Sequence, residues 1–226
     1  GSGLNRPAGV IVETVQGEGG VNVARPEWLR GLAELCRRHD MLLIVDDVQM
    51  GCGRTGPFFS FEPAGIVPDV VCLSKSIGGY GMPLALTLFR PELDIWEPGE
   101  HNGTFRGHNP AFVTATAALD TYWTDDQLEK QTLVKGEQVA EGLASLAAEY
   151  AEQGAVYRGR GLIWGLTFDD RTRAAAVCGR AFELGLLVET SGPEGEVVKV
   201  MPPLTVTPGE LDEGLAILGR AVRETA

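Results

Sequence analysis

The chain has 226 residues, of which 44% are hydrophobic and 22% charged, so it is not an intrinsically disordered protein and its length predicts one large or two modest domains. Its formal charge of −12 argues against nucleic acid or an anionic membrane surface as a partner, because both attract clustered cations. Glycine accounts for 30 residues, which predicts tight turns or close approach of the backbone to a ligand.

Cysteine and histidine usage excludes the common metal sites. The four cysteines lie far apart in the sequence, and with only three histidines we expect no metal and a reduced, cytoplasmic setting. The longest apolar run, at 41–45, is too short to cross a bilayer, so we expect no membrane partner. The chain opens with Gly-Ser-Gly rather than methionine and soon enters an apolar run, so we expect it to be part of a longer protein.

The first half of the chain contains four short apolar runs that predict strands, at 8–13, 42–45, 70–73 and 84–89. Between the first two runs, segment 25–39 places Trp28, Leu32 and Cys36 at helical spacing and has Pro26 near its start, which predicts a helix. Apolar runs of this kind are typical of strands buried on both faces of a mostly parallel sheet. We therefore expect an α/β fold.

The second half has a different character. Segments 111–123 and 126–150 predict two long helices with a break near Thr124. Beyond Gly154, alternation predicts strands at 162–168, 186–190 and 197–201, and further helices at 171–184 and 208–222. We therefore expect part of a large parallel-sheet domain over 1–124 and a smaller α+β domain, with its connecting helix, over 125–226.

Polar residues gather where the predicted strands end. Asp46 and Asp47 follow the second run and Lys75 follows the third, and ligands of open α/β sheets bind at this edge. Asp46 could instead cap a helix with Asp47 solvated, and Lys75 could be an ordinary surface lysine. A lysine and a carboxylate that converge at one edge match the needs of pyridoxal phosphate, whose aldehyde takes a lysine and whose pyridinium nitrogen takes an acid.

Four motifs occur along the chain in a fixed order: Glu-Thr-Val-Gln-Gly-Glu-Gly-Gly at 13–20, Val-Asp-Asp-Val-Gln-Met-Gly-Cys-Gly-Arg-Thr-Gly at 45–56, Leu-Ser-Lys-Ser at 73–76 and His-Asn-Gly-Thr-Phe-Arg-Gly at 101–107. Together they resemble the class III, pyridoxal-phosphate-dependent aminotransferases. The resemblance implies the rear part of a fold-type I enzyme, comprising later strands of its large domain and its C-terminal domain. It also implies a cytoplasmic homo-oligomer built on a dimer with a shared active site.

The resemblance also implies residue roles around the cofactor. Lys75 would form the internal aldimine and shuttle the proton between Cα and C4′, while Asp46 would pair with the pyridine nitrogen. Val48 would pack against the ring and Gln49 would contact its phenolic oxygen. Thr104 would reach the cofactor phosphate of a partner subunit. Catalysis is thus expected from Lys75 and Asp46, and cofactor binding from all five.

Two further residues are expected near the substrate. Glu13 matches a glutamate at the substrate end of the site, where it can neutralise an arginine that binds the α-carboxylate of a keto acid. Lys199 stands where many family members carry an arginine before Pro-Pro-Leu, which here is Pro202-Pro203-Leu204. Lysine offers a point charge rather than a bidentate fork. A substrate-carboxylate contact and an ordinary strand lysine both remain open for Lys199.

A narrower resemblance inside the family concerns the segments at 56–62, 98–107 and 198–205. It implies transfer of the ω-amino group between L-2,4-diaminobutyrate and 2-oxoglutarate on one side and L-aspartate 4-semialdehyde and L-glutamate on the other, as in the first step of ectoine synthesis. Ornithine, acetylornithine, 4-aminobutyrate and semialdehyde aminomutase reactions are alternatives, since a fold does not fix a substrate. A further alternative is a non-catalytic fragment or interaction subunit that needs its missing N-terminal half.

Overall fold

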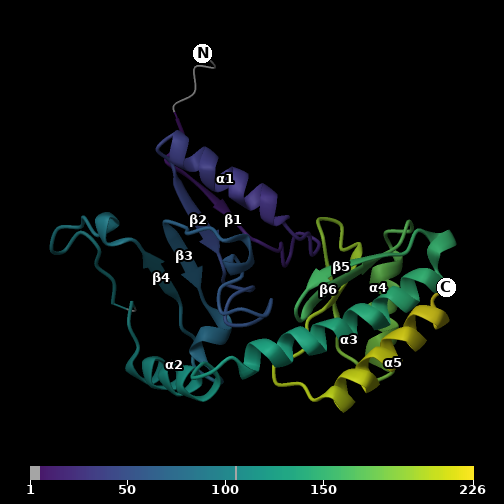
Figure 1. Cartoon of the computed structure of the whole chain (residues 1–226). Coiled ribbons are helices and arrows are strands. Elements are labelled where there is room, and N and C mark those ends of the chain that lie inside the picture. Colours follow the sequence, from purple (N-terminus) through teal and green to yellow (C-terminus); the bar gives the residue numbers. More distant parts are fainter. Residues whose placement is uncertain (1–5, 105) are drawn as a thin grey trace. The chain divides into compact units, whose positions relative to one another are not determined.

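The computed structural model describes residues 6–104 and 106–226 (Figure 1). It divides into two compact units that are both discontinuous in sequence. Unit 1 comprises the described residues of 1–14, 24–52 and 59–127, and unit 2 comprises 15–23, 53–58 and 128–226. Two short loops from the first quarter of the chain therefore belong with its C-terminal half. The domain boundary after residue 124 remains a prediction.

Unit 1 is built on a four-stranded sheet in the order β1-β2-β3-β4. Strands β1 (Gly9–Val12), β2 (Leu42–Asp46) and β3 (Val70–Leu73) are parallel, and β4 (Leu86–Phe89) pairs antiparallel with β3. Val12 lies opposite Val45, and Asp46 lies opposite Cys72. The α/β class and the mostly parallel sheet expected from the apolar runs are confirmed.

Helix α1 (Pro26–Arg38) forms the crossover between β1 and β2 (Figure 1). Its buried residues are Leu29 and Cys36, whereas Trp28 is 49% exposed, so the apolar face is rotated from the one that the spacing predicts. In β1, Ile11 is 62% exposed. No residue of β1 is buried, and three of the four residues of β4 are exposed, so the expectation that the strands are buried on both faces is wrong for the two outer strands of this sheet.

The remaining elements of unit 1 are short apart from one helix. They are the 3₁₀ turns η1 (Glu62–Ala64), η2 (Lys75–Gly78) and η3 (Pro91–Leu93), and the helix α2 (Asn109–Tyr122). Thr114 on α2 donates its hydroxyl to the carbonyl of Gly78 at 2.8 Å. This bond fixes α2 against the turn that begins with Lys75.

Unit 2 contains a second, wholly antiparallel sheet in the order β5-β6-β8-β7. Its elements are α3 (Gln127–Glu149), η4 (Ala151–Gln153), β5 (Val156–Arg160), β6 (Ile163–Thr167), α4 (Arg173–Glu183), β7 (Glu189–Ser191), β8 (Val197–Val200) and α5 (Pro208–Glu224). The expected α+β character and the helix break near Thr124 are confirmed. Strand β5 was not expected, because its arginines and glycine obscure the apolar alternation.

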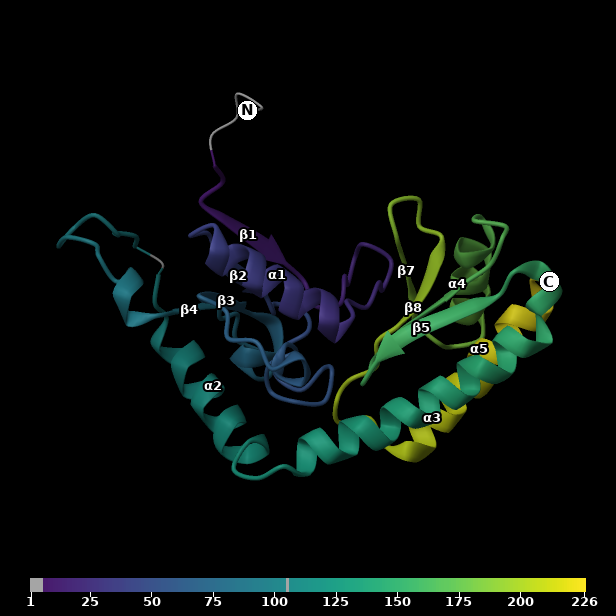
Figure 2. The same cartoon turned by 45° about the horizontal axis from the view of Figure 1, so that its top comes forward.

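The core of unit 2 lies between its helices and one face of its sheet. Leu143 of α3, Val177 of α4 and Leu218 of α5 are almost wholly buried, together with Leu166 of β6 and Val198 of β8. Helices α3 and α5 run side by side (Figure 2). Because the two central strands contribute to this core, it holds β8 rigidly and with it the residues on the opposite face of that strand.

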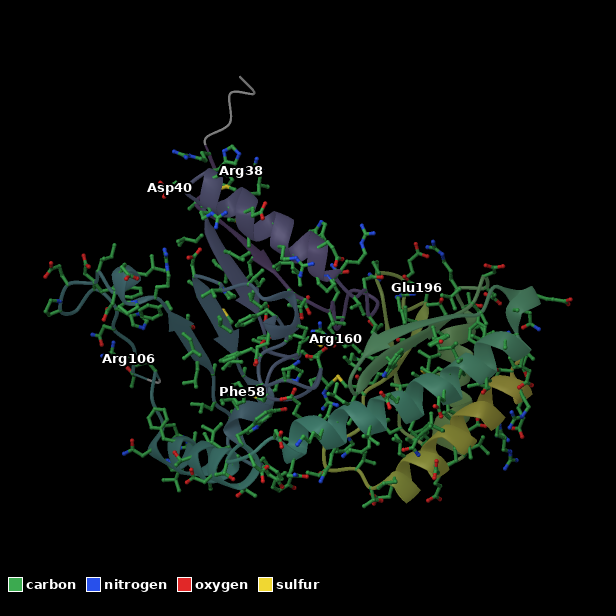
Figure 3. All side chains as sticks on the ribbon, viewed as in Figure 1. Arg38, Asp40, Phe58, Arg106, Arg160 and Glu196 are labelled. Atoms are coloured by element: carbon green, nitrogen blue, oxygen red, sulfur yellow. The ribbon has the colours of Figure 1, made fainter. Side chains whose placement is uncertain are left out.

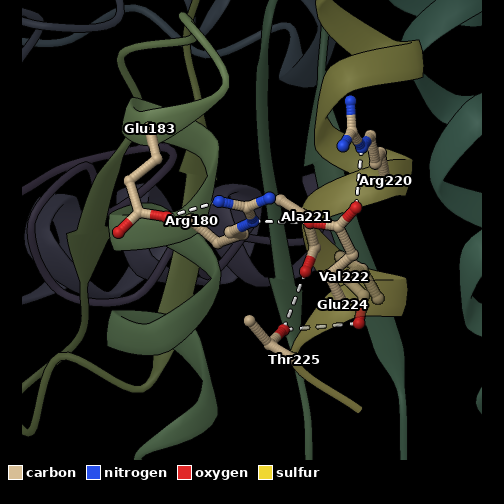
Figure 4. A network of polar contacts seen from close by, with 7 residues as sticks. All are labelled: Arg180, Glu183, Arg220, Ala221, Val222, Glu224 and Thr225. Carbon is tan, nitrogen blue, oxygen red and sulfur yellow. Dashed lines mark hydrogen bonds and ion pairs between the residues drawn. The ribbon is translucent and has the colours of Figure 1, made fainter.

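A network of charged side chains joins α4 and α5 at the surface of unit 2. Arg180 on α4 donates to Glu224 on α5 at 2.5 Å and also pairs with Glu183, one turn further along α4 (Figure 4). Arg220 donates to the same Glu224 at 2.7 Å, so this carboxylate joins two guanidinium groups. The hydrogen bonds from Arg220 and Arg180 hold the pKa of Glu224 below its usual value. A shared carboxylate of this kind fixes the register of α4 against α5 more firmly than an isolated surface pair.

Two glycines allow three segments of unit 2 to meet. A Cβ on Gly136 of α3 would lie 2.5 Å from the carbonyl oxygen of Gly161, in the turn between β5 and β6. Gly161 has φ +58°, and a Cβ there would lie 2.6 Å from the carbonyl oxygen of Arg54. Because the obstructing atoms are backbone, no larger residue fits at either position. The loop at 53–58 is thereby packed against α3 and the β5–β6 hairpin.

Candidate active site

Chemistry-bearing residues follow all three parallel strands of unit 1. Glu13 comes directly after β1, Asp46 ends β2, and Lys75 lies two residues beyond β3. The parallel register places the carboxyl ends of these strands along one edge of the sheet. Asp46 and Lys75 thus follow neighbouring parallel strands, as their places after the second and third apolar runs predict. Glu13 lies at the same edge, beyond the strand on the other side of β2.

Lys75 has an unusual backbone. Its φ is +53°, in the left-handed region, and it begins the turn η2. A lysine in that region costs roughly 1–3 kcal/mol, and such strain is retained at sites where the surroundings impose it. The surroundings here are specific, because Ser74 donates to the carbonyl of Leu84 at 2.9 Å, and a Cβ on Gly79, which has φ +68°, would lie 3.0 Å from the carbonyl oxygen of Thr114. The exposed Lys75 side chain is thus presented from a fixed backbone.

The two adjacent aspartates have different surroundings. Asp46 is half-buried and accepts a hydrogen bond from the Val48 amide at 3.1 Å, which shapes the turn after β2. Asp47 is 1% exposed and accepts from both the amide (3.0 Å) and the hydroxyl of Ser60. Thr14 donates in turn to the Ser60 hydroxyl at 2.6 Å. The solvated alternative for Asp47 is therefore wrong, and the described residues after Asp46 form turns rather than a helix that it could cap.

The other expected cofactor contacts lie in two loops of unit 1. Val48 and Gln49 are half-buried in the turns after β2. Thr104 is exposed in a turn of the segment between β4 and α2. Arg106, labelled in Figure 3, belongs to the same segment and donates to the carbonyl of His101. This hydrogen bond spans Thr104 and closes the turn on which it lies.

The cysteines offer no nucleophile. Burial and the nearby Asp47 charge raise the pKa of the Cys52 thiol to about 12, and burial with Glu189 raises that of Cys178 to about 11. The pKa values of Cys36 and Cys72 are raised too, chiefly by burial. All four thiols stay protonated at neutral pH, and a thiol in that state is a poor nucleophile. Among the described residues, no three His, Cys, Asp or Glu side chains gather to hold a metal.

Lys199, on β8 of unit 2, has two carboxylate partners. Its side chain is 5% exposed, and its Nζ lies 2.8 Å from Glu18 Oε1 and 3.4 Å from Glu189 Oε2. An ordinary strand lysine keeps its ammonium in water, whereas this one is buried and paired. Sequence reasoning missed both partners of Lys199, because it expected Glu13 to neutralise an arginine and gave Lys199 no carboxylate partner. The only sequence signal for these partners was Glu18, a carboxylate inside the glycine-rich loop at 16–20. Glu189 gave no signal as a partner before the pairing of β7 with β8 was known.

Hydrogen bonds within unit 2 fasten the glycine-rich loop to the β7–β8 hairpin. The Gly20 amide donates to the Ser191 hydroxyl at 3.0 Å, and that hydroxyl donates to the Gly17 carbonyl at 2.8 Å. The Gly192 amide donates to the Glu18 carbonyl at 3.0 Å. Because the backbone on both sides of Glu18 is fixed, a movement of Glu18 away from Lys199 involves its side chain rather than the loop.

Arg54 joins the loop after β2 to the segment that follows Lys199. It is 7% exposed and donates to the carbonyls of Leu162 (3.0 Å) and Pro202 (2.5 Å), while its own carbonyl accepts from the Leu162 amide at 2.9 Å. Burial lowers the pKa of its guanidinium to about 10. All these residues belong to unit 2. Arg54 is therefore a brace within that unit.

We expect Arg54→Met to lower the free energy of unfolding by about 2–4 kcal/mol, because two buried carbonyls lose their donor. Urea unfolding of the whole protein, followed by tryptophan fluorescence, measures this as a lower midpoint. Arg30→Met is the matched control, since that guanidinium is half-exposed and donates to a single carbonyl, Ala64 O, and to Glu27. Equal midpoints for the two variants would contradict the bracing role.

Known proteins resemble the chain over its whole length. The model of the class-III aminotransferase family matches residues 4–222. A diaminobutyrate–2-oxoglutarate transaminase of Streptomyces anulatus is 73% identical over all of this chain and 53% of its own length, and one of Sporosarcina pasteurii is 57% identical over 99% and 53%. The acetylornithine aminotransferase structure from Elizabethkingia anophelis has TM-score 0.86 and 30% identity, over 96% of this chain and 57% of its own. This chain thus spans about half the length of the relatives it matches.

The residues at the strand edge fit the cofactor of that family. Class III aminotransferases depend on pyridoxal phosphate, which requires a primary amine for its aldehyde and an acid for its ring nitrogen. Unit 1 supplies both from adjacent parallel strands, with the amine of Lys75 on a strained, fixed backbone and the carboxylate of Asp46 half-buried. On the family match and the fold together, this chain belongs to the class-III aminotransferases.

Proposed function

We propose that the chain is the rear part of a diaminobutyrate–2-oxoglutarate aminotransferase. The observation that carries this proposal is 73% identity, over the whole chain, to a transaminase of that name, joined to an edge that presents Asp46 and Lys75. The reaction exchanges the ω-amino group of L-2,4-diaminobutyrate with the oxo group of 2-oxoglutarate. In the biosynthetic direction, L-aspartate 4-semialdehyde is aminated by L-glutamate.

Each residue at the edge has a task in this reaction. Pyridoxal phosphate, when bound, supplies an electron-withdrawing ring that stabilises the charge left on the reacting carbon. Lys75 Nζ provides the primary amine for the cofactor aldehyde and carries a proton to and from the substrate carbon. Asp46 would hold the proton on the pyridine nitrogen. Val48 would pack on the ring, Gln49 would contact the phenolic oxygen, and Thr104 would bind the phosphate.

The remaining residues serve the substrate and the assembly. Lys199 binds the α-carboxylate of the keto acid, and Glu18 neutralises Lys199 until that carboxylate arrives. A buried ammonium needs a partner at every stage, because an unpaired charge is costly in such surroundings. Glu13 faces the substrate from the end of β1. Thr104 serves the cofactor of a partner subunit, so we place the enzyme in a homo-oligomer built on a dimer with shared active sites.

The physiological setting follows from the substrate. We place the reaction in the cytoplasm, as the first step of ectoine synthesis. In the described residues, no helix is both long and apolar enough to cross a membrane.

A panel of amino donors tests the proposed substrate. The holoenzyme that contains this chain is assayed for glutamate formation from 2-oxoglutarate with L-2,4-diaminobutyrate, ornithine, acetylornithine and 4-aminobutyrate. We expect diaminobutyrate to give at least a tenfold higher kcat/KM than any other donor. One methylene separates it from ornithine, a difference worth about 10–200-fold in a fitted pocket. Dominant turnover of ornithine or acetylornithine, the substrates named for solved relatives at about 30% identity, would overturn the choice.

A further inference from the structure

In the cluster formed by Lys199, Glu18 and Glu189, one lysine has two carboxylate partners. One ammonium, on a side chain 5% exposed, faces two carboxylates whose side chains are 70% and 72% exposed. A single carboxylate is enough to neutralise a buried lysine. The second adds repulsion to any further carboxylate that approaches, so its presence calls for a task of its own.

The two carboxylates reach Lys199 in different ways. Glu189 lies directly opposite Lys199 in the antiparallel pairing of β7 with β8, which places the two side chains on one face of the sheet. Glu18 reaches the same nitrogen from the glycine-rich loop, and its 2.8 Å contact is a direct hydrogen bond. The strand pairing keeps Glu189 near Nζ whatever occupies the position of the Glu18 carboxylate.

We propose that Glu189 is a specificity-determining residue, which stays paired with Lys199 when a keto-acid carboxylate displaces Glu18 and keeps the binding of that carboxylate weak and reversible. The proposal rests on the function proposed above. With Glu189 in place, Lys199 never becomes an uncompensated buried charge. The incoming carboxylate binds a lysine that is already half neutralised, so 2-oxoglutarate binds less tightly and glutamate leaves sooner.

The proposal predicts that Glu189 affects the binding of the two substrates differently. The keto acid displaces Glu18 and therefore feels the charge of Glu189. Diaminobutyrate, which reacts through its ω-amino group, leaves the Glu18 pair in place. Removing the charge of Glu189 should consequently tighten the binding of 2-oxoglutarate and of other dicarboxylates while leaving diaminobutyrate unchanged.

Glu189→Gln in the pyridoxal-phosphate-loaded enzyme tests this. We expect the KM for 2-oxoglutarate, and the competitive inhibition constant of glutarate, to fall about two- to fivefold, the effect of one partly exposed charge pair. The KM for diaminobutyrate should change by less than about twofold on the same grounds. Glu189→Asp keeps the charge and should restore the parent values.

Glu194→Gln is the matched control. It removes the same charge from the loop of the same hairpin, but Glu194 pairs with Arg171 at 2.6 Å rather than with Lys199. The proposal is overturned if Glu189→Gln and Glu194→Gln give equal constants, if the constant for glutarate rises, or if both substrates change alike. Failure of diaminobutyrate as a donor would count against the proposed function alone, because glutarate competition can be measured with any donor that the enzyme accepts.

Discussion

Replacement of Lys75 by alanine is expected to reduce the turnover number of the holoenzyme by on the order of 10²–10⁴-fold, the contribution of a positioned general base, and further through loss of the nucleophilic amine. The visible absorption of the bound cofactor should shift, and borohydride should no longer fix the cofactor to the protein. Absorption spectra and the mass of the borohydride-treated enzyme measure both effects.

Two controls separate the amine of Lys75 from its charge and from folding. Lys75→Arg keeps the cation but has no primary amine, and a guanidinium does not lose its proton in proteins, so it should be as inactive as the alanine variant. Lys130→Ala removes an exposed lysine on α3 and should behave as the parent. An unshifted cofactor band in Lys75→Ala, with the cofactor still fixed to the protein by borohydride, would contradict the assignment of Lys75.

Asp46→Asn is expected to reduce the turnover number by about 10²–10³-fold, the usual cost of losing one preorganised electrostatic contact in an active site. An amide keeps the shape and the hydrogen bond from Val48, but it has no charge to hold the proton on the pyridine nitrogen. The cofactor should remain bound, and its pyridine nitrogen should lose its proton at a lower pH than in the parent. A spectrophotometric pH titration of the holoenzyme measures the shift directly.

Asp47→Asn is the natural comparison, because it removes the neighbouring carboxylate. Asp47 is buried and accepts from the amide and hydroxyl of Ser60, so its loss should lower the free energy of unfolding by about 1–3 kcal/mol. The cofactor titration should stay where it is in the parent. If Asp47→Asn moved the titration and Asp46→Asn did not, the two roles would be exchanged.

The parallel part of the fold was predictable because its signals are local. Continuous apolar runs predicted β2 and β3 within one residue, and polar residues at their ends predicted where Asp46 and Lys75 would lie. The α1 crossover fixed the order of β1 and β2. By contrast, Trp28 belonged to the predicted apolar face of that helix and is half exposed, since periodicity finds a face but not what covers it.

The surroundings of Lys199 could not be predicted, because they depend on contacts between remote segments. Glu18 pairs with it across 181 positions, and Glu189 does so only through the register of β7 with β8. The register of the short strand β7 is weakly encoded in its own three residues, and a shift of one residue would move each of its side chains to the opposite face of the sheet. No carboxylate partner was therefore predicted for Lys199, and Glu13 was predicted to neutralise an arginine; Glu18 is the carboxylate that contacts Lys199.

The discontinuity of unit 2 has a consequence for the order in which the chain folds. The loop that carries Glu18 is fixed by Ser191 and Gly192, so its resting shape cannot exist until a polypeptide some 170 residues longer has been made. Closing so long a loop is entropically unfavourable and slow. During synthesis the early strands of unit 1 can pair first. The Glu18–Lys199 contact is then among the last contacts to form. A molecule in which this contact is present has therefore already formed its C-terminal sheet.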